Sequence, residues 1–539
     1  MQEGSANPCT LVGGRIHTMD PSRPLASSIA WAEGRILAVD PPRPIGRVID
    51  LRGQTALPGL IDAHLHLALG GETLLQLDLS TARHRADFER LVAERAATLP
   101  RDGWLIARSW NEDAFEERST PDRTWLRAAG DRPAVAWRMD HHACVLNDAA
   151  IDLLAARQDL GVDPPGGRIE RDGTGRPTGL FQEAAAWKLV NPMLPSPSLE
   201  ERREAVRAAQ RSLASLGLTS VGSMEYASVV RDAIEPLRAE LAVRMRVTLL
   251  DRDWPLDLGY ATGFANDERL AVIGMKAFID GTLGSRTARM LEPYDDDRAN
   301  RGLLVELAER GVLVDWIRHV RAAGLSPSMH AIGDEAARLA LDAIDASDAP
   351  GAPPARVEHA QTLDRADIIR FAGRFAGRFA SMQPLHKAYD ARSAATRLGP
   401  GRMDRFFPFR SLHHAGARLA FGSDWPIVSP DPILGLAAAI TGLDVDGQPC
   451  RVEENLGVHA ALAAYTSGAA ACLNIDAGVL AAGKLADITV VDADPYACDW
   501  RTRRPRVTMT LMGGVVTGGV VTGGVVTGGV VTGGVAQDR

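Results

Sequence analysis

The stretch LPGLIDAHLHLALG at residues 57–70 decides the fold, because an apolar run ends there in His64-Leu65-His66. Side chains alternate along a strand with a period of two, so both imidazoles face the same side. Two neutral imidazoles at this spacing can hold one divalent ion from the end of a strand. Alternatively, the two histidines have unrelated structural roles, and residues elsewhere in the chain decide between these interpretations.

Beyond this stretch, apolar strand-like runs alternate with helical runs rich in alanine, arginine and leucine. For example, RREAVRAAQRSLASLG at 202–217 precedes LTSVGSM, and VLVDWIRHVRAAG at 312–324 precedes LSPSMH. Such alternation is typical of βαβ units and a parallel sheet. The number of units favours an α/β fold of the TIM type, a (β/α)8 barrel, over an open sheet.

The remaining segments have a different texture. Glycine turns separate short β-prone runs at both chain ends, and a Trp-, Pro- and Gly-rich region interrupts the barrel pattern. The repeat VVTGG at the C-terminus is explained by replication slippage or by a functional tail. The expected parts are a composite β-sandwich from 1–57 and 476–512, a catalytic barrel from 58–70 and 201–475, an inserted α+β subdomain at 71–200 and a repeat tail at 513–539.

Further polar residues stand where other strand-like runs end. His330 ends LSPSMH, His359 ends RVEH, and Asp424 follows ARLAFGS. In a barrel of parallel strands, catalytic residues lie at the carboxyl ends of the strands, in the loops that follow them. Four histidines and an aspartate at such positions favour a metal site over unrelated structural residues.

Lysine is rare in this chain, since only four of the 60 basic residues are lysines. One of them, Lys276, lies inside the apolar run IGMKAF, where an ammonium group has to be paired or lose its proton. A neutral lysine can react with carbon dioxide to give a carbamate, an anionic ligand able to bridge two metals. A salt bridge to Asp280 is the alternative.

Composition excludes several classes of protein. The chain has 539 residues, 45% of them hydrophobic, and a formal net charge of −8, which excludes a disordered chain and disfavours nucleic acid as a partner. Five dispersed cysteines without C-x-x-C spacing predict reduced thiols and a cytoplasmic location. We expect neither a secretory signal nor a membrane span.

Taken together, these residues resemble the amidohydrolase superfamily, specifically amidohydrolase family 3, the YtcJ-like branch. The resemblance covers nearly the whole chain. It is carried by PGLIDAHLH at 58–66, RMDHHACVLN at 138–147, GGRIERDGTGRPTGLFQE at 166–183, GMKAFIDGTLGSRTA at 274–288, MHAIGD at 329–334, RVEHAQ at 356–361, SMQPLHKAYD at 381–390, FGSDWP at 421–426, AYTSGAA at 464–470 and AAGKLADITVVDADP at 481–495.

The resemblance implies a metal-dependent hydrolase barrel with two divalent ions, usually zinc. His64 and His66 would bind one ion, and His330 and His359 would bind the other. An N6-carboxylated Lys276 would bridge them, and Asp424 would bind metal and transfer protons as the catalytic residue. The expected substrate contacts, each of which could equally be a packed or solvated residue, are His142, Arg286, His386 and Trp425.

Two residues are candidates for orienting the histidines, namely Glu358 beside His359 and Asp334 after His330. Glu358 is the weaker candidate, because adjacent residues on a strand point to opposite faces.

The expected activity is hydrolysis of a non-peptide C–N bond by a metal-activated hydroxide, in an N-substituted amide, a formamide, a carbamate or a cyclic amide. An esterase or lactonase on the same scaffold is one alternative, and a non-catalytic regulatory protein that retains the metals is another. The expected partner is a small-molecule substrate, and a homodimeric assembly is left open.

Overall fold

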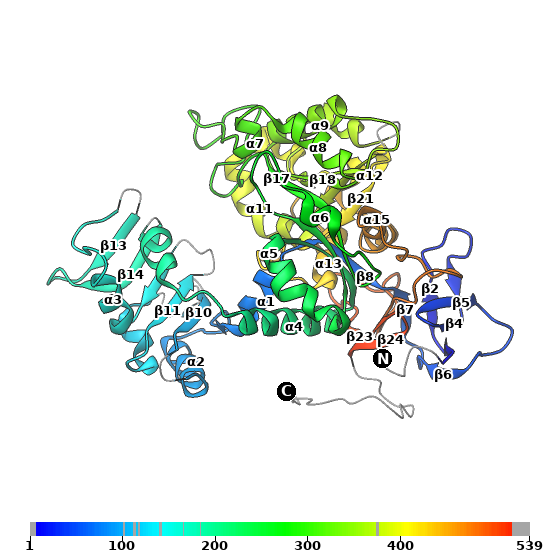
Figure 1. Cartoon of the computed structure of the whole chain (residues 1–539), viewed down its shortest axis with the longest axis horizontal. Coiled ribbons are helices and arrows are strands. Elements are labelled where there is room, and N and C mark those ends of the chain that lie inside the picture. Colours follow the sequence, from blue (N-terminus) through cyan, green and yellow to red (C-terminus); the bar gives the residue numbers. More distant parts are fainter. Residues whose placement is uncertain are drawn as a thin grey trace. The chain divides into compact units, whose positions relative to one another are not determined.

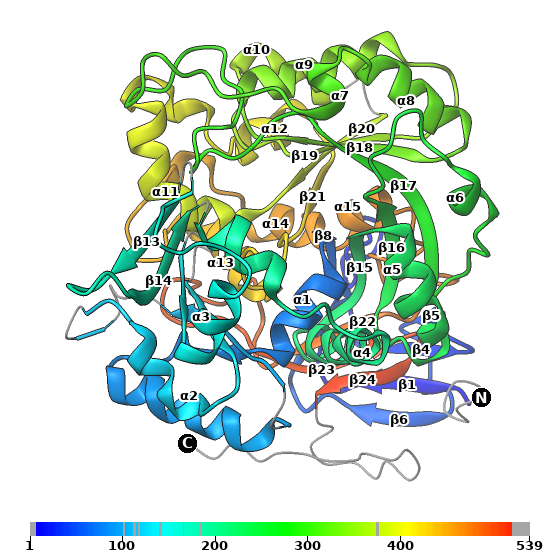
Figure 2. The same ribbon diagram turned by 60° about the vertical axis from the view of Figure 1, so that its left-hand side comes forward.

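The computed structural model describes residues 7–100, 103–110, 115–116, 119–138, 143–164, 167–183, 185–372 and 377–519. The chain divides into two compact units. The main unit consists of Met1–Ala68 and Ala209–Arg539, and the inserted unit consists of Leu69–Ala208. Figures 1 and 2 show the elements of both units.

Eight strands of the main unit form one sheet in which paired neighbours run parallel. In sheet order they are β8 (Leu60–Leu65), β15 (Leu218–Glu225), β16 (Arg244–Leu249), β17 (Leu270–Phe278), β18 (Ser326–Ala331), β19 (Ala355–His359), β20 (Arg378–Met382) and β21 (Leu419–Phe421). Backbone hydrogen bonds beyond the end strands join the two edges, from Asp424 N to His64 O at 2.6 Å and from His66 N to Trp425 O at 2.8 Å. The predicted (β/α)8 barrel is thereby confirmed.

Helices follow these strands and lie outside them, as Figure 2 shows for α8 and α9. Among them are α4 (Leu199–Ser215), α8 (Leu313–Ala322), α9 (Asp334–Ala346), α11 (Pro384–Leu398), α12 (Phe409–Ala415), α13 (Pro432–Thr441), α14 (Val458–Ala464) and α15 (Ser467–Cys472). In α8 the buried residues Leu313, Trp316, Ile317 and Val320 follow a helical spacing of three and four. This apolar stripe explains why the segment packs as a helix against the sheet.

Two further sheets of the main unit combine both ends of the chain. One contains β5 (Arg35–Val39), β4 (Ile29–Ala32), β1 (Cys9–Val12) and β6 (Arg47–Asp50). The other contains β24 (Val515–Gly519), β23 (Val507–Met512), β22 (Ile488–Val491), β7 (Thr55–Pro58), β2 (Arg15–His17) and β3 (Leu25–Ala26). One hydrophobic core joins the sheets, with Leu11 and Trp31 from the first and Ile488 and Leu511 from the second.

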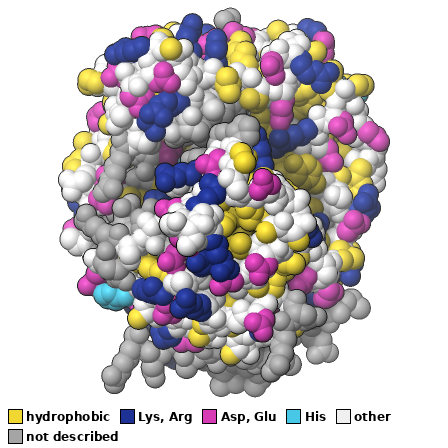
Figure 3. All heavy atoms as spheres, turned by 90° about the vertical axis from the view of Figure 1, so that its left-hand side faces the viewer, with side chains coloured by type: hydrophobic (Ala, Val, Ile, Leu, Met, Phe, Trp, Pro, Cys, Tyr) yellow, Lys and Arg dark blue, Asp and Glu magenta, His cyan; other side chains and the backbone are white. Residues whose placement is uncertain are grey.

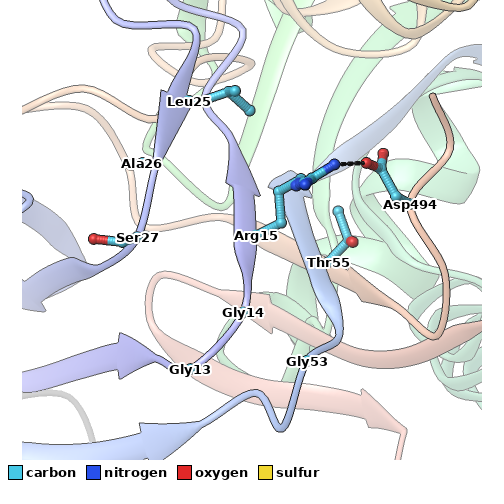
Figure 4. Close-up of a pocket in the computed structure, with 9 residues that line it drawn as sticks. All are labelled: Gly13, Gly14, Arg15, Leu25, Ala26, Ser27, Gly53, Thr55 and Asp494. Atoms are coloured by element: carbon cyan, nitrogen blue, oxygen red, sulfur yellow. Dashed lines mark hydrogen bonds and ion pairs between the residues drawn. The ribbon is translucent and has the colours of Figure 1, made fainter. Parts of the chain in front are cut away.

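The first VVTGG unit forms β24 and pairs with β23 in this sandwich. Residues 520–539 lie outside the described part of the chain. A shallow depression elsewhere on the sandwich is lined by Gly13, Gly14 and Gly53 and by the ion pair of Arg15 with Asp494 (Figure 4). It belongs to the sandwich sheets rather than to the ends of the barrel strands.

The inserted unit is built on a mixed sheet of six strands. In sheet order they are β13 (Gly167–Arg171), β14 (Pro177–Glu183), β12 (Ala143–Leu146), β11 (Ala134–Arg138), β10 (Leu105–Trp110) and β9 (Leu77–Asp78). Helix α2 (Arg85–Thr98) contributes Phe88 to one core, and α3 (Asp148–Ala155) contributes Ile151 and Leu154 to another. This unit is an α+β subdomain.

Basic and acidic side chains are intermixed on the face drawn in Figure 3. Within the residues that the structure describes, no helix combines the length and the apolar character needed to cross a bilayer.

Candidate metal centre

The carboxyl end of β8 brings two histidines and an aspartate together. His64 lies in β8, His66 is the first residue after this strand, and Asp424 follows β21. Asp424 Oδ1 lies 3.4 Å from His64 Nε2 and 3.2 Å from His66 Nε2. One ligand atom from each of the three residues lies within 4.8 Å of the others. Two imidazole nitrogens and a carboxylate oxygen at these distances suit a divalent transition metal.

A β-bulge sets the course of β8 at this point. The register with β15 shifts between Val221 and Ser223, so that Ala63 and His64 lie opposite the single residue Gly222. A Cβ atom on Gly222 would come within 2.3 Å of the Ala63 carbonyl oxygen, and therefore only glycine permits this close approach. Bulges beside functional sites redirect side chains, and this one directs His64.

His330 and His359 come from the neighbouring strands β18 and β19. Their ring centres are 4.4 Å apart, and the ring of His359 is 5.2 Å from that of His64. His359 has a φ of 70°, which ends the extended conformation of β19. The structure therefore brings all four predicted histidines and Asp424 to one face of the barrel.

Lys276 lies on β17, beside β18, and its side chain is buried. Burial lowers the pKa of its ammonium group to about 8, against the opposing influence of the Glu358 and Asp424 carboxylates. Its Nζ atom lies 5.2 Å from the centre of the Phe278 ring. These neighbours place the Lys276 side chain at the histidine cluster, with a pKa that permits a neutral amine near pH 8.

Asp280 shapes the loop that follows β17. Its carboxylate accepts hydrogen bonds from the backbone N–H groups of Arg289 at 2.8 Å, Ile332 at 3.1 Å and Gly333 at 2.8 Å. Burial raises the pKa of Asp280 to about 7, and these hydrogen bonds oppose the shift. The carboxylate thus organises the backbone around His330 instead of being dedicated to a salt bridge with Lys276.

Each of the four histidines uses one ring nitrogen for a hydrogen bond to the protein. Such bonds fix the orientation of a ring and leave its other nitrogen for a metal ion. The donations are from His64 Nδ1 to Glu358 Oε2 at 2.6 Å, from His66 Nδ1 to Met224 O at 3.2 Å, from His330 Nε2 to Gly281 O at 3.0 Å and from His359 Nδ1 to Gln383 Oε1 at 2.9 Å.

Two orienting residues differ from the sequence-based expectation. Glu358 holds His64, which lies on another strand of the barrel, and not its neighbour His359. The left-handed φ of His359 breaks the alternation, so both residues of this adjacent pair reach the cluster. Asp334, the other candidate, accepts a hydrogen bond from Leu291 N and pairs with Arg405. Gln383 carried no signal in the sequence beyond its position at a strand end.

The electrostatics of the cluster favour the forms that bind metals. Burial lowers the pKa of His330 to about 3 and lowers that of His359 well below its usual value. Burial would raise the pKa of Asp424, but His64, His66 and His359 outweigh it and hold that pKa well below its ordinary value. Neutral imidazoles and an ionised carboxylate are the ligating forms, so these residues fit a divalent ion.

The predicted substrate contacts fall into three groups. His386 lies beside the cluster, with Nε2 3.9 Å from Asp424 Oδ2, and Trp425 follows Asp424 directly. Arg286 makes two hydrogen bonds to Asp296, from Nε at 3.1 Å and from Nη2 at 2.7 Å. The fourth, His142, lies outside the described residues.

Comparison with known proteins relates the sequence of this chain to a family. The model of the "Amidohydrolase family" matches residues 47–518. The chain is 34% identical to "Putative amidohydrolase YtcJ" of Bacillus subtilis over 84% of this chain and 86% of that protein. It is 26% identical to "N-substituted formamide deformylase" of Arthrobacter pascens over 94% of this chain and 97% of that protein.

A solved structure shows the same architecture. An uncharacterized metal-dependent hydrolase from Pyrococcus furiosus superposes with a TM-score of 0.73 at 26% identity. The match covers 91% of this chain and all of that chain. The barrel and the additional sheets are therefore shared with a metal-dependent hydrolase.

Proposed function

The chain belongs to the amidohydrolase family and is a hydrolase, and on that premise we propose that it cleaves a C–N bond other than a peptide bond. The cluster of His64, His66 and Asp424 at the catalytic face of the barrel is the observation that carries this proposal. The likeness to an N-substituted formamide deformylase supports the bond type. N-substituted amides, formamides, carbamates and cyclic amides form the substrate class.

We assign two divalent ions, with zinc as the first choice, to the cluster. His64 and His66 would hold one ion, His330 and His359 the other, and Asp424 would contribute its carboxylate. When bound, such ions lower the pKa of water towards neutrality and polarise a carbonyl group. Nitrogen and oxygen donors with buried, neutral imidazoles support this assignment.

Lys276 would complete the ligand set as a carbamate. Its neutral amine adds to carbon dioxide, a C–N bond forms, and the displaced proton passes to solvent. Burial lowers the pKa of Lys276 to about 8, so that a substantial fraction of the amine is neutral near that pH. Arginine could not take this role, because its guanidinium group stays protonated.

Asp424 is the proposed catalytic residue. Its low pKa keeps the carboxylate ionised and able to accept a proton from water, and delivery of that proton to the leaving nitrogen completes C–N cleavage. His386 lies near the second carboxylate oxygen, so a substrate held there would meet both groups. We propose His386, Trp425 and Arg286 as substrate contacts.

The proposal also covers the cellular location of the enzyme and the size of its substrate. All five cysteines are free thiols, which supports a cytoplasmic location as part of the proposal. A small-molecule substrate fits a site at the ends of barrel strands.

The decisive experiment is a substrate screen with the metal-reconstituted full-length protein. Aryl and alkyl formamides, N-substituted amides, carbamates, cyclic amides and matched esters would be assayed in parallel. We expect turnover of a C–N substrate that is at least tenfold faster than that of its ester. A faster ester would favour the esterase or lactonase alternative. Absence of any turnover by metal-loaded protein would favour a binding protein.

A further inference from the structure

We propose that Arg356, which is absent from the proposed ligand set, is a positioning residue that fixes His64 for metal binding through Glu358. Arg356 and Glu358 lie two positions apart on β19 and are buried, with exposures of 1% and 0%. The spacing places both side chains on the same face of the strand. The inference rests on the proposed metal ligands, because it concerns how one of them is held.

Arg356 reaches His64 by two routes. Its Nε atom lies 2.7 Å from Glu358 Oε1, and the other carboxylate oxygen of Glu358 accepts the hydrogen bond from His64 Nδ1 at 2.6 Å. Its Nη2 atom donates to the carbonyl oxygen of Ala63 at 2.7 Å. Arg356 therefore holds the ring of His64 through Glu358 and its backbone through the preceding residue.

The β-bulge explains why the Ala63 carbonyl is available to Arg356. At the bulge, Ala63 and His64 share one opposing residue, Gly222, and the regular ladder is interrupted. A guanidinium group in this position satisfies the carbonyl and stabilises the bulged course of β8. Ser328 Oγ on β18 also donates to Glu358, so neighbouring strands fix the carboxylate.

The arrangement has a consequence for the metal. With Nδ1 donating to Glu358, the Nε2 nitrogen of His64 faces Asp424 and is left for the metal ion. Loss of the carboxylate would release the ring and permit the other tautomer. Outer partners of ligating histidines contribute about 10–100-fold to metal affinity or activity.

The test measures zinc affinity by competition with a chelating dye, alongside unfolding by urea, for metal-free wild type, Glu358→Gln and Arg356→Met. We expect each variant to bind the tighter zinc ion about 10–100-fold more weakly. The double variant should be no weaker than the worse single one, because both act through His64. The absorption bands of the cobalt-substituted protein should shift in the same variants.

The matched control is the Arg244–Asp487 ion pair, which is also buried and has a 2.9 Å contact, but joins β16 to the sandwich. Arg244→Met should lower the free energy of unfolding and leave zinc affinity within twofold of wild type. Zinc affinity equal to that of wild type in Arg356→Met or in Glu358→Gln, or an equal loss in Arg244→Met, would overturn the inference. If Arg356→Met does not fold, Ser328→Ala provides the milder perturbation, with a loss of several-fold expected and none contradicting it.

This outcome is separable from that of the proposed function. Zinc binding weakened in Glu358→Gln, in a protein whose wild type hydrolyses no C–N bond, would retain the positioning role and refute the activity. Unchanged zinc affinity in Glu358→Gln, together with C–N hydrolysis by the wild type, would refute the positioning role and retain the activity.

Discussion

Asp424 donates a backbone hydrogen bond to His64 O at 2.6 Å, and the side chains of the same two residues approach to 3.4 Å. The backbone contact joins the two edges of the eight-stranded sheet, and the side-chain contact lies within the candidate metal centre. Closure of the barrel and assembly of the site thus depend on the same pair of residues. Variants of Asp424 can separate these roles, because a side-chain substitution keeps the backbone N–H.

Asp424→Asn should abolish proton transfer while the barrel stays closed. We expect turnover of the best C–N substrate to fall about 10²–10⁴-fold, which is the usual contribution of a positioned general acid–base. The far-ultraviolet circular dichroism should match wild type, since the hydrogen bond to His64 O remains. Steady-state kinetics at equal metal content test this, and near-full turnover would remove Asp424 from its proposed role.

Gly222→Ala should disturb the bulge without touching a proposed ligand directly. Its new methyl group would meet the Ala63 carbonyl oxygen at 2.3 Å, so β8 has to shift. Such overpacking costs about 1–3 kcal/mol of stability. We expect urea unfolding to show that loss and dye competition to show weaker zinc binding. Gly311→Ala is a control in open space at a positive φ, and it should lose stability without losing zinc affinity.

Sequence patterns predicted the arrangement of residues along each strand and missed contacts between distant strands. The period-two rule identified His64 and His66, and the ends of apolar runs located His330, His359 and Asp424. The same rule disfavoured Glu358, because it assumes an extended backbone up to His359. The actual φ of 70° at His359 lies outside that assumption.

Contacts between residues that are distant in sequence also could not be predicted from local sequence patterns. Arg286 stays a proposed substrate contact, and the two hydrogen bonds from its guanidinium group to Asp296, ten residues further on, were not predicted from the sequence. The contact of Arg356 with Ala63 could not be predicted from the motif RVEHAQ, because Ala63 is distant in sequence and contributes only a carbonyl oxygen. Pairings of this kind emerge only when the barrel brings the strands together.

Lys387→Met should alter the dependence of stability on pH. Burial lowers the pKa of Lys387 to about 8, and the folded protein therefore loses this proton before the unfolded chain does. Below pH 8 both states are protonated, and wild type carries the full cost of burying the charge. Between pH 8 and 10.5 the unfolded state binds more protons, so wild-type stability from this group rises with pH.

The methionine variant lacks that rise. Its stability relative to wild type should fall by about 2 kcal/mol between pH 7 and pH 9.5, as one pKa unit corresponds to about 1.4 kcal/mol. The variant also loses the contacts of Lys387 with the Arg451 carbonyl and the Phe409 ring. This loss shifts the free energy of unfolding by the same amount at every pH and leaves its change with pH unaffected. Urea unfolding at both pH values checks this, and parallel behaviour of the two proteins would contradict it.

His386→Asn should affect substrate use more than metal binding. The histidine lies 3.9 Å from Asp424 and donates to the Ser423 carbonyl at 3.2 Å, beside the proposed ligands. Loss of one substrate hydrogen bond corresponds to about a five- to tenfold lower kcat/KM. Metal content should stay at the wild-type level. A variant with unchanged kcat/KM for every substrate would exclude His386 as a contact.

The most direct test of the central claim is the number of metal ions per chain, measured by elemental analysis of protein purified from metal-supplemented medium. The proposed binuclear site predicts two ions per chain in wild type and fewer in both His64→Asn and Lys276→Ala, with activity falling in parallel. Wild-type protein that is folded but contains no zinc, iron or manganese would contradict the account.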